Sequence, residues 1–183
     1  MQGTRGTKEV LRLSKIIVAL DYPNSEQAIG LTEKVGQQAI YKVGMELFNA
    51  VGPEMVEQLT EKGYKVFLDL KFHDIPNTVA GAARSAVRTG CFMFNVHAFG
   101  GSKMMRAAVD AARDEAACLN KPCPKIIAVT ILTSTGEDEL HNELNVSMPL
   151  KDYVVHLALL TKQAGLDGVV ASPHEIQAIR KAC

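Results

Sequence analysis

Short apolar runs alternate with longer segments of helical pattern along almost the whole chain. The run at 16–20 has no polar interruption, which is typical of a strand covered on both faces. Asn24 then provides a helix N-cap, with Gln27 three positions later as a loose capping box. The predicted strands span 16–20, 40–46, 65–71, 92–97, 125–132 and 167–171, and the predicted helices span 25–37, 53–62, 76–89, 100–118, 150–163 and 172 to the chain end.

This alternation predicts an α/β fold with a parallel sheet and helices outside it. Two architectures remain open, an open doubly wound sheet and a (β/α)8 TIM barrel. Polar residues lie at the C-terminal ends of many predicted strands, whereas an open sheet concentrates its ligand site at one switch point, so their distribution favours the barrel. No GxGxxG motif follows the first strand, which weakens the case for a nucleotide-binding open sheet. A barrel has eight units and about 250 residues, whereas we count about six units in 183 residues. We therefore expect one barrel domain over 16–183, incomplete at its C-terminal end, after a flexible extension at 1–15.

Composition narrows the possible partners. The formal net charge is zero, with 20 acidic and 20 basic residues, so nothing favours nucleic acid or another polyanion. No run reaches the roughly 18 apolar residues of a membrane span, and no secretory apolar core follows the N-terminus. The four cysteines show no CxxC spacing, so we expect reduced thiols in a cytoplasmic protein.

The most informative stretch is DLKFHDIPNT at 69–78, at the predicted end of the third strand. Side chains alternate along a strand, so Asp69 and Lys71 are expected to point the same way, with Asp74 in the following turn. On the preceding strand Lys42 shares a face with Glu46 and can enter the same interior. A lysine among carboxylates keeps its proton and can act as a general acid. The alternative is a salt-bridge layer that contributes little to stability.

Other candidates are less specific. Asp21 can bind hydroxyl groups or complete a charge chain, but it also suits a turn before Tyr22-Pro23. His73 and His97, together with the nearby aspartates, suggest a metal site as an alternative. The positive charge of Lys71 would compete with a bound cation. We therefore predict no metal. The polar segment 137–149 is interpreted as a lid or binding loop.

Beyond these patterns, the sequence closely resembles the orotidine 5′-phosphate decarboxylase family in its bacterial form. The resemblance runs from about residue 16 to the chain end, with the motifs in family order. The motifs are VALD at 18–21, YKVGMELF at 41–48, DLKFHDIPNT at 69–78, NVHA at 95–98 and VTILTS at 129–134.

The resemblance implies a (β/α)8 barrel, usually a homodimer, that converts orotidine 5′-phosphate to UMP and carbon dioxide without metal or organic cofactor. By position, Lys71 would protonate C6 of the pyrimidine, and Asp69 would lie against the departing carboxylate. Lys42 would pair with Asp69 and a ribose hydroxyl. Asp74 would reach the site of the partner subunit.

The resemblance assigns four further substrate-binding roles. Asp21 would bind ribose hydroxyls and Thr133 would lie near the pyrimidine. Thr78 would act on the ribose across the dimer, and Ile75 would also contact substrate.

The family's last two strands, with a glycine-rich phosphate loop and its arginine, have no counterpart in the sequence. An inactive barrel fragment is therefore one alternative. Another is a sugar-phosphate decarboxylase or aldolase of the same barrel group, such as 3-keto-gulonate 6-phosphate decarboxylase or hexulose-phosphate synthase. These share the Asp-x-Lys-x-x-Asp core and use Mg²⁺, whereas Ile75-Pro76-Asn77-Thr78 favours the pyrimidine enzyme.

Overall fold

Six parallel strands form one sheet in the order in which they occur in the chain. The computed structural model describes residues 16–183, so the extension predicted at 1–15 lies outside the described residues. A doubly wound sheet reverses its strand order partway, whereas a barrel adds each strand beside the previous one. The sequential order therefore confirms the barrel topology. The strands are β1 (Ile17–Ala19), β2 (Ile40–Gly44), β3 (Lys65–Phe72), β4 (Met93–His97), β5 (Lys125–Val129) and β6 (Gly168–Val170).

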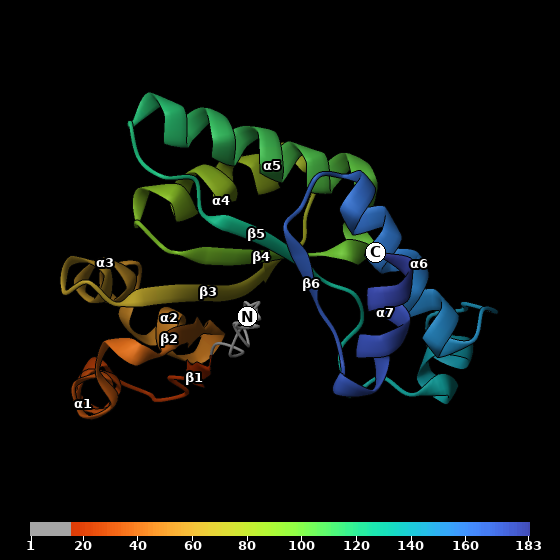
Figure 1. Ribbon diagram of the computed structural model, residues 1–183, viewed down its shortest axis with the longest axis horizontal. Coiled ribbons are helices and arrows are strands. Elements are labelled where there is room, and N and C mark those ends of the chain that lie inside the picture. The colour runs from red at the N-terminus through yellow and green to blue at the C-terminus, as the bar shows by residue number, and fades with distance from the viewer. Residues whose placement is uncertain (1–15) are drawn as a thin grey trace, which may run out of the picture.

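Helices follow the strands and surround them (Figure 1). The predicted cap of the first helix is confirmed, because Asn24 Oδ1 accepts the Gln27 backbone N–H at 3.0 Å. Ser172 likewise caps the turn that leads into the last helix. The helices are α1 (Ser25–Val35), α2 (Met45–Val51), α3 (Glu54–Glu61), α4 (Pro76–Arg88), α5 (Gly101–Cys118), α6 (Leu150–Gln163) and α7 (Ile176–Ala182).

Two predicted strand ends are wrong. The second strand stops at Gly44, and Glu46 lies in the first turn of α2 rather than on the strand face of Lys42. Good helix-forming residues follow Gly44, and burial of Leu47 anchors the extra helix until Gly52, with φ of +94°, ends it. The fifth strand ends at Val129 instead of residue 132. Both errors lie at the C-terminal end of a strand, where the loop or helix that follows it begins.

Alternate residues of the central strands face the helices and form the main apolar core. The opposite parity places Lys42, Asp69 and Asn95 on the inner side of the sheet. This inner side at the C-terminal strand ends is where the polar residues gather. The helix-facing strand residues of the core include Tyr41, Val43, Val66, Leu68, Phe94, Val96, Ile126 and Ala128.

All four cysteines carry free thiols. Cys91 is buried, and burial raises the pKa of its thiol to about 12. The other three cysteines are exposed. Within residues 16–183, no helix has the length and apolar character that crossing a membrane would require.

Candidate active site

Asp69 and Lys71 meet at the C-terminal end of β3. Lys71 Nζ lies 2.8 Å from Asp69 Oδ1, which confirms the predicted juxtaposition of the two side chains. The Asp69 side chain is only 12% exposed, so its charge is largely removed from water. The backbone is not a regular strand at this point, because Lys71 has a φ of +53°. That left-handed conformation is unfavourable for a lysine and requires support from its surroundings.

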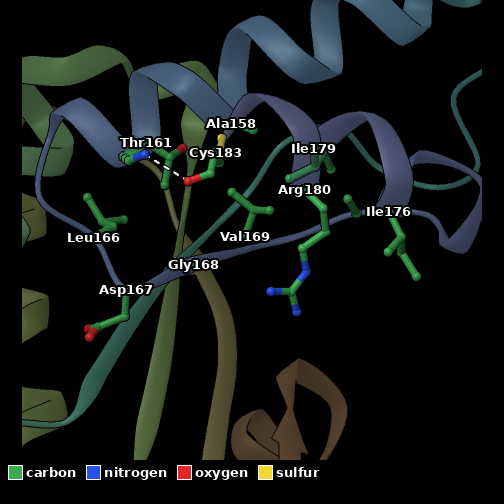
Figure 2. A pocket seen from close by; sticks show the side chains of 12 residues that line it. Ala158, Thr161, Leu166, Asp167, Gly168, Val169, Ile176, Ile179, Arg180 and Cys183 are labelled. Atoms are coloured by element: carbon green, nitrogen blue, oxygen red, sulfur yellow. Dashed lines mark hydrogen bonds between the residues drawn. The ribbon is translucent and has the colours of Figure 1, made fainter. Parts of the chain in front are cut away.

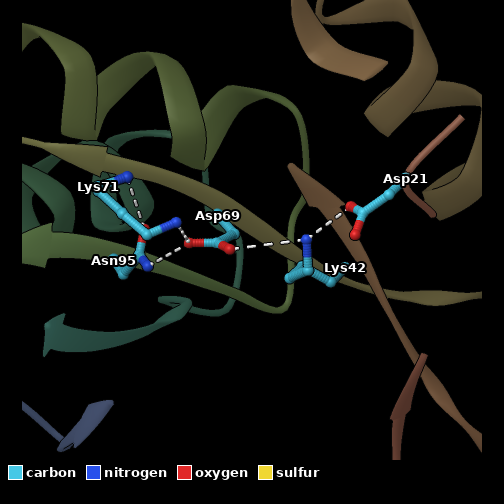
Figure 3. A network of polar contacts seen from close by, with 5 residues as sticks. All are labelled: Asp21, Lys42, Asp69, Lys71 and Asn95. Atoms are coloured by element: carbon cyan, nitrogen blue, oxygen red, sulfur yellow. Dashed lines mark hydrogen bonds and ion pairs between the residues drawn. The ribbon is translucent and has the colours of Figure 1, made fainter. Parts of the chain in front are cut away.

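Lys42 of β2 joins this pair to Asp21, which follows β1 (Figure 3). Its Nζ lies 2.9 Å from Asp21 Oδ1 and 3.7 Å from Asp69 Oδ2. Asp21, Lys42, Asp69 and Lys71 thus form a row of alternating charges, called here the charge array. Lys42 and Asp69, the two inner members of the array, each lie between two groups of opposite charge. The array can therefore hold two ammonium groups beside the largely buried Asp69 carboxylate.

Gly44 leaves the room that Lys42 needs. A Cβ added at Gly44 would lie 2.9 Å from Lys42 Nζ and 3.5 Å from Asp21 Oδ1. Any side chain at this position would therefore require the Lys42 ammonium to shift.

Asn95 of β4 is a site residue for which the sequence analysis named no role. Its side chain is 1% exposed, donates from Nδ2 to Asp69 Oδ1 at 2.6 Å and accepts the Lys71 backbone N–H on Oδ1 at 2.8 Å. A signal for it existed in the sequence, since Asn95 is the one uncharged polar residue inside the run Phe92-Met93-Phe94-Asn95-Val96. Buried carboxamides require hydrogen-bond partners, which only the fold reveals.

The remaining predicted site residues lie outside the charge array. Asp74 and Ile75 occupy the exposed turn after β3, where Asp74 Oδ1 accepts the Ile75 backbone N–H at 2.6 Å. Thr78 lies exposed in the first turn of α4, and Thr133 is exposed in the turn after β5. Within residues 16–183, no hydrogen bond or ion pair joins any of these four residues to the array. Their predicted roles remain predictions.

His73 and His97 stack beside the array, with ring centroids 5.3 Å apart. Burial lowers the pKa of His97, and the nearby His73 and Lys71 charges act in the same direction. Both rings line a cavity of about 380 Å³ together with Phe99 and Ser134. No group of three or more potential ligands among histidine, cysteine and acidic residues gathers for a metal ion in the described part of the chain.

A larger cavity of about 620 Å³ opens between α6, β6 and α7 (Figure 2). Its walls are largely aliphatic, with Val169 and Ile179 among them, and Lys162 Nζ donates to the Cys183 carbonyl at 2.7 Å on its rim. None of the predicted site residues lines it. The predicted catalytic side chains therefore gather in the charge array and not in this larger cavity.

The segment predicted as a lid contains a π-helical turn at Glu139–Glu143. Both carboxylate oxygens of Glu137 accept the Leu150 backbone N–H, at 3.0 and 3.1 Å, which ties the segment's start to the start of α6. Its function as a lid remains a prediction.

The sequence also matches a known family. Residues 14–183 match the model of the orotidine 5′-phosphate decarboxylase / HUMPS family. The curated orotidine 5′-phosphate decarboxylase of Moorella thermoacetica is 52% identical over 180 residues, which cover 96% of this chain and 71% of that protein.

Solved structures give the same relationship. Orotidine 5′-phosphate decarboxylase from Lactobacillus acidophilus superposes with a TM-score of 0.85 at 42% identity, covering 91% of this chain and 75% of that one. The Methanocaldococcus jannaschii orotidine 5′-monophosphate decarboxylase, solved with the inhibitor BMP, has a TM-score of 0.72 at 24% identity. It covers 92% of this chain and 73% of its own, and its likeness supports the fold.

Proposed function

Because the chain belongs to the orotidine 5′-phosphate decarboxylase / HUMPS family, we propose that it is a carboxy-lyase that converts orotidine 5′-phosphate to UMP and carbon dioxide in pyrimidine biosynthesis. The observation that carries the proposal is the 2.8 Å pair of Asp69 and Lys71 at the C-terminal end of β3, with Lys42 beside it. In a barrel this edge holds the catalytic groups. The free cysteines fit a reducing compartment such as the cytoplasm.

The reaction needs a proton donor at the carbon that loses its carboxylate. The bond between C6 and the carboxylate breaks, carbon dioxide leaves, and the electron pair remains on C6. Lys71 Nζ then gives its proton to C6 to form UMP, and the neutral amine regains a proton from water. An ammonium held in place before the reaction stabilises the developing negative charge without reorganisation, and the contact to Asp69 holds it there.

Asp69 is proposed to act on the bound substrate before carbon dioxide leaves. Facing the substrate carboxylate, its largely buried charge raises the energy of bound substrate, and the repulsion disappears as carbon dioxide leaves. Lys42 and Asp21 lie next in the array, and the proposed role of both is to bind ribose hydroxyls. Thr133 is proposed to lie near the pyrimidine, and Ile75 is proposed to contact substrate.

The turn after β3 is proposed to serve a partner copy of the chain. Asp74, Ile75 and Thr78 are all exposed, and the Ile75 side chain presents 66% of its surface despite being apolar. In a homodimer, Asp74 and Thr78 would extend the alternating charges and the ribose contacts of the partner's site.

Mixing two inactive variants tests this sharing. Lys71→Ala and Asp74→Ala are each expected to be inactive, while refolding them together restores about a quarter of wild-type activity, because random pairing makes half the dimers mixed and each has one intact site. Activity is measured after mixing and compared with each variant refolded alone. If Asp74 acts within its own subunit, every site contains one defect and the mixture stays inactive.

The proposed reaction is tested by following the loss of orotidine 5′-phosphate in the presence of EDTA. We expect decarboxylation without added metal, because the Lys42 and Lys71 ammonium groups supply positive charge of the kind that Mg²⁺ supplies in the metal-dependent relatives. Activity that appears only after Mg²⁺ addition, or with a sugar phosphate alone, would contradict the assignment.

A further inference from the structure

The pairing of β3 with β4 is interrupted at the charge array. Leu68 pairs with Phe94 and Phe72 pairs with Val96, so three residues of β3 stand opposite the single residue Asn95. An extra length in one strand leaves backbone groups without their ladder partners. The Lys71 backbone N–H finds its acceptor in the Asn95 side chain instead, at 2.8 Å.

The same carboxamide also binds the catalytic carboxylate. Asn95 Nδ2 donates to Asp69 Oδ1 at 2.6 Å, the oxygen that also accepts from Lys71 Nζ at 2.8 Å. The two partners fix the orientation of the amide, because a backbone N–H requires the carbonyl oxygen and a carboxylate requires the NH₂ group. One buried side chain therefore connects the backbone of Lys71 to the carboxylate that holds its ammonium.

We propose that Asn95 is a positioning residue, which holds the left-handed backbone at Lys71 and the Asp69 carboxylate in one rigid unit and thereby places the Lys71 ammonium for proton transfer. The proposal rests on the proposed decarboxylase function. A lysine with φ of +53° persists only where its surroundings hold it. Neither Asp69 nor Lys71 has a second side-chain contact that joins backbone to carboxylate in this way among the described residues.

Few other side chains could replace Asn95. Alanine removes both hydrogen bonds. Aspartate keeps the shape and the acceptor for the Lys71 N–H, but an ionised carboxylate repels Asp69. Once protonated, however, the new carboxyl group donates to Asp69 through its O–H and accepts from Lys71 through its C=O, which reproduces the carboxamide. Repulsion between the neighbouring carboxylates favours this protonated form.

The experiment compares wild type, Asn95→Ala, Asn95→Asp and the control Thr161→Val. Thr161 is also buried and hydrogen-bonded, through Oγ1 to the Leu157 carbonyl, but it lies on α6 away from the array. Asn95→Ala is expected to lower kcat about 10²-fold with KM changed less than about threefold, since a small misplacement of a catalytic group costs about this much. Thr161→Val is expected to lower the melting temperature without changing kcat.

The pH dependence separates positioning from simple structural support. For Asn95→Asp we expect the ratio of its kcat to that of wild type to rise several-fold between about pH 8 and about pH 6, as the new carboxyl group takes up its proton. A ratio that does not change with pH overturns the proposal. So does an Asn95→Ala variant with a kcat within twofold of wild type.

A structural measurement decides the matter independently of turnover. The crystal structure of Asn95→Ala is expected to show Lys71 outside the left-handed region and its Nζ withdrawn from Asp69. An unchanged φ and an unchanged contact to Asp69 overturn the inference. Absence of activity in wild type would instead overturn the proposed function, and this measurement would still test the role of Asn95.

Discussion

Replacing Lys71 by alanine is expected to lower kcat for orotidine 5′-phosphate by about 10⁴-fold or more, because the change removes both the proton donor and a fixed positive charge. The fold should survive. Asp69 keeps a hydrogen bond from Asn95 and an ion pair with Lys42, so no buried charge is left without a partner. Steady-state kinetics together with thermal unfolding measure the two effects.

Lys125→Ala is a matched control for this variant. Lys125 also pairs with an aspartate, with Nζ 2.7 Å from Oδ1 of Asp167, which lies just before β6, but Lys125 begins β5 and so lies at the opposite end of the sheet. Its replacement should leave kcat within about twofold of wild type, since an exposed ion pair contributes little even to stability. Near-normal turnover by Lys71→Ala would eliminate the proposed role of Lys71.

Asp69→Asn is expected to lower kcat about 10³-fold while orotidine 5′-phosphate binds as tightly as before or more tightly. Two like charges about 4 Å apart repel by about 4 kcal/mol at an effective dielectric near 20, and the neutral amide removes this repulsion from the substrate complex. Lys42 and Lys71 then attract the substrate carboxylate without opposition. UMP carries no such carboxylate, so its affinity should change much less.

The measurement is binding of substrate and product to Asp69→Asn, with the slow variant allowing substrate affinity to be read before turnover. Asp167→Asn serves as the control, because it removes a carboxylate that accepts from Lys125 and from the Ile126 backbone N–H at 2.9 Å, away from the array. Weaker substrate binding with an unchanged kcat would show that Asp69 only helps to bind substrate.

Together the two variants separate the two halves of the proposed mechanism. Loss of Lys71 removes stabilisation of the developing carbanion, whereas loss of Asp69 removes repulsion in the ground state and loosens the lysine. If ground-state repulsion were negligible, substrate and product affinity for Asp69→Asn would change in parallel.

Local pattern in the sequence was sufficient for most of the elements and for the centre of the site. The period of apolar residues distinguishes strands from helices, because side chains repeat every two residues in a strand and every 3.6 in a helix. Their separation by two residues on one predicted strand led to the expected pairing of Asp69 with Lys71, although the left-handed backbone at Lys71, with a φ of +53°, departs from the regular alternation behind that expectation. The helix cap at Asn24 is equally local.

Contacts between side chains on different strands could not be predicted from local sequence and became clear only from the tertiary structure. Sequence reasoning allowed Asp21 to be either a turn residue or part of a charge chain, and only the pairing of β1 with β2 brings it to Lys42. Glu46 was predicted on the strand because burial of Leu47, which makes the helix favourable, cannot be read from the local pattern. The sheet order that decided for the barrel is likewise a relation between elements distant in sequence.

The contacts of Asn95 are the clearest example of a feature that local sequence pattern does not predict. Its position on a strand was predictable, but its function depends on a register interruption between β3 and β4 that brings its carboxamide to Asp69 and to the backbone of Lys71. Local sequence pattern therefore predicted the six strands, most of the helices and the charged groups at the strand ends. Tertiary structure decided how those groups are held, because hydrogen bonds between strands follow from register and packing rather than from the composition of any one segment.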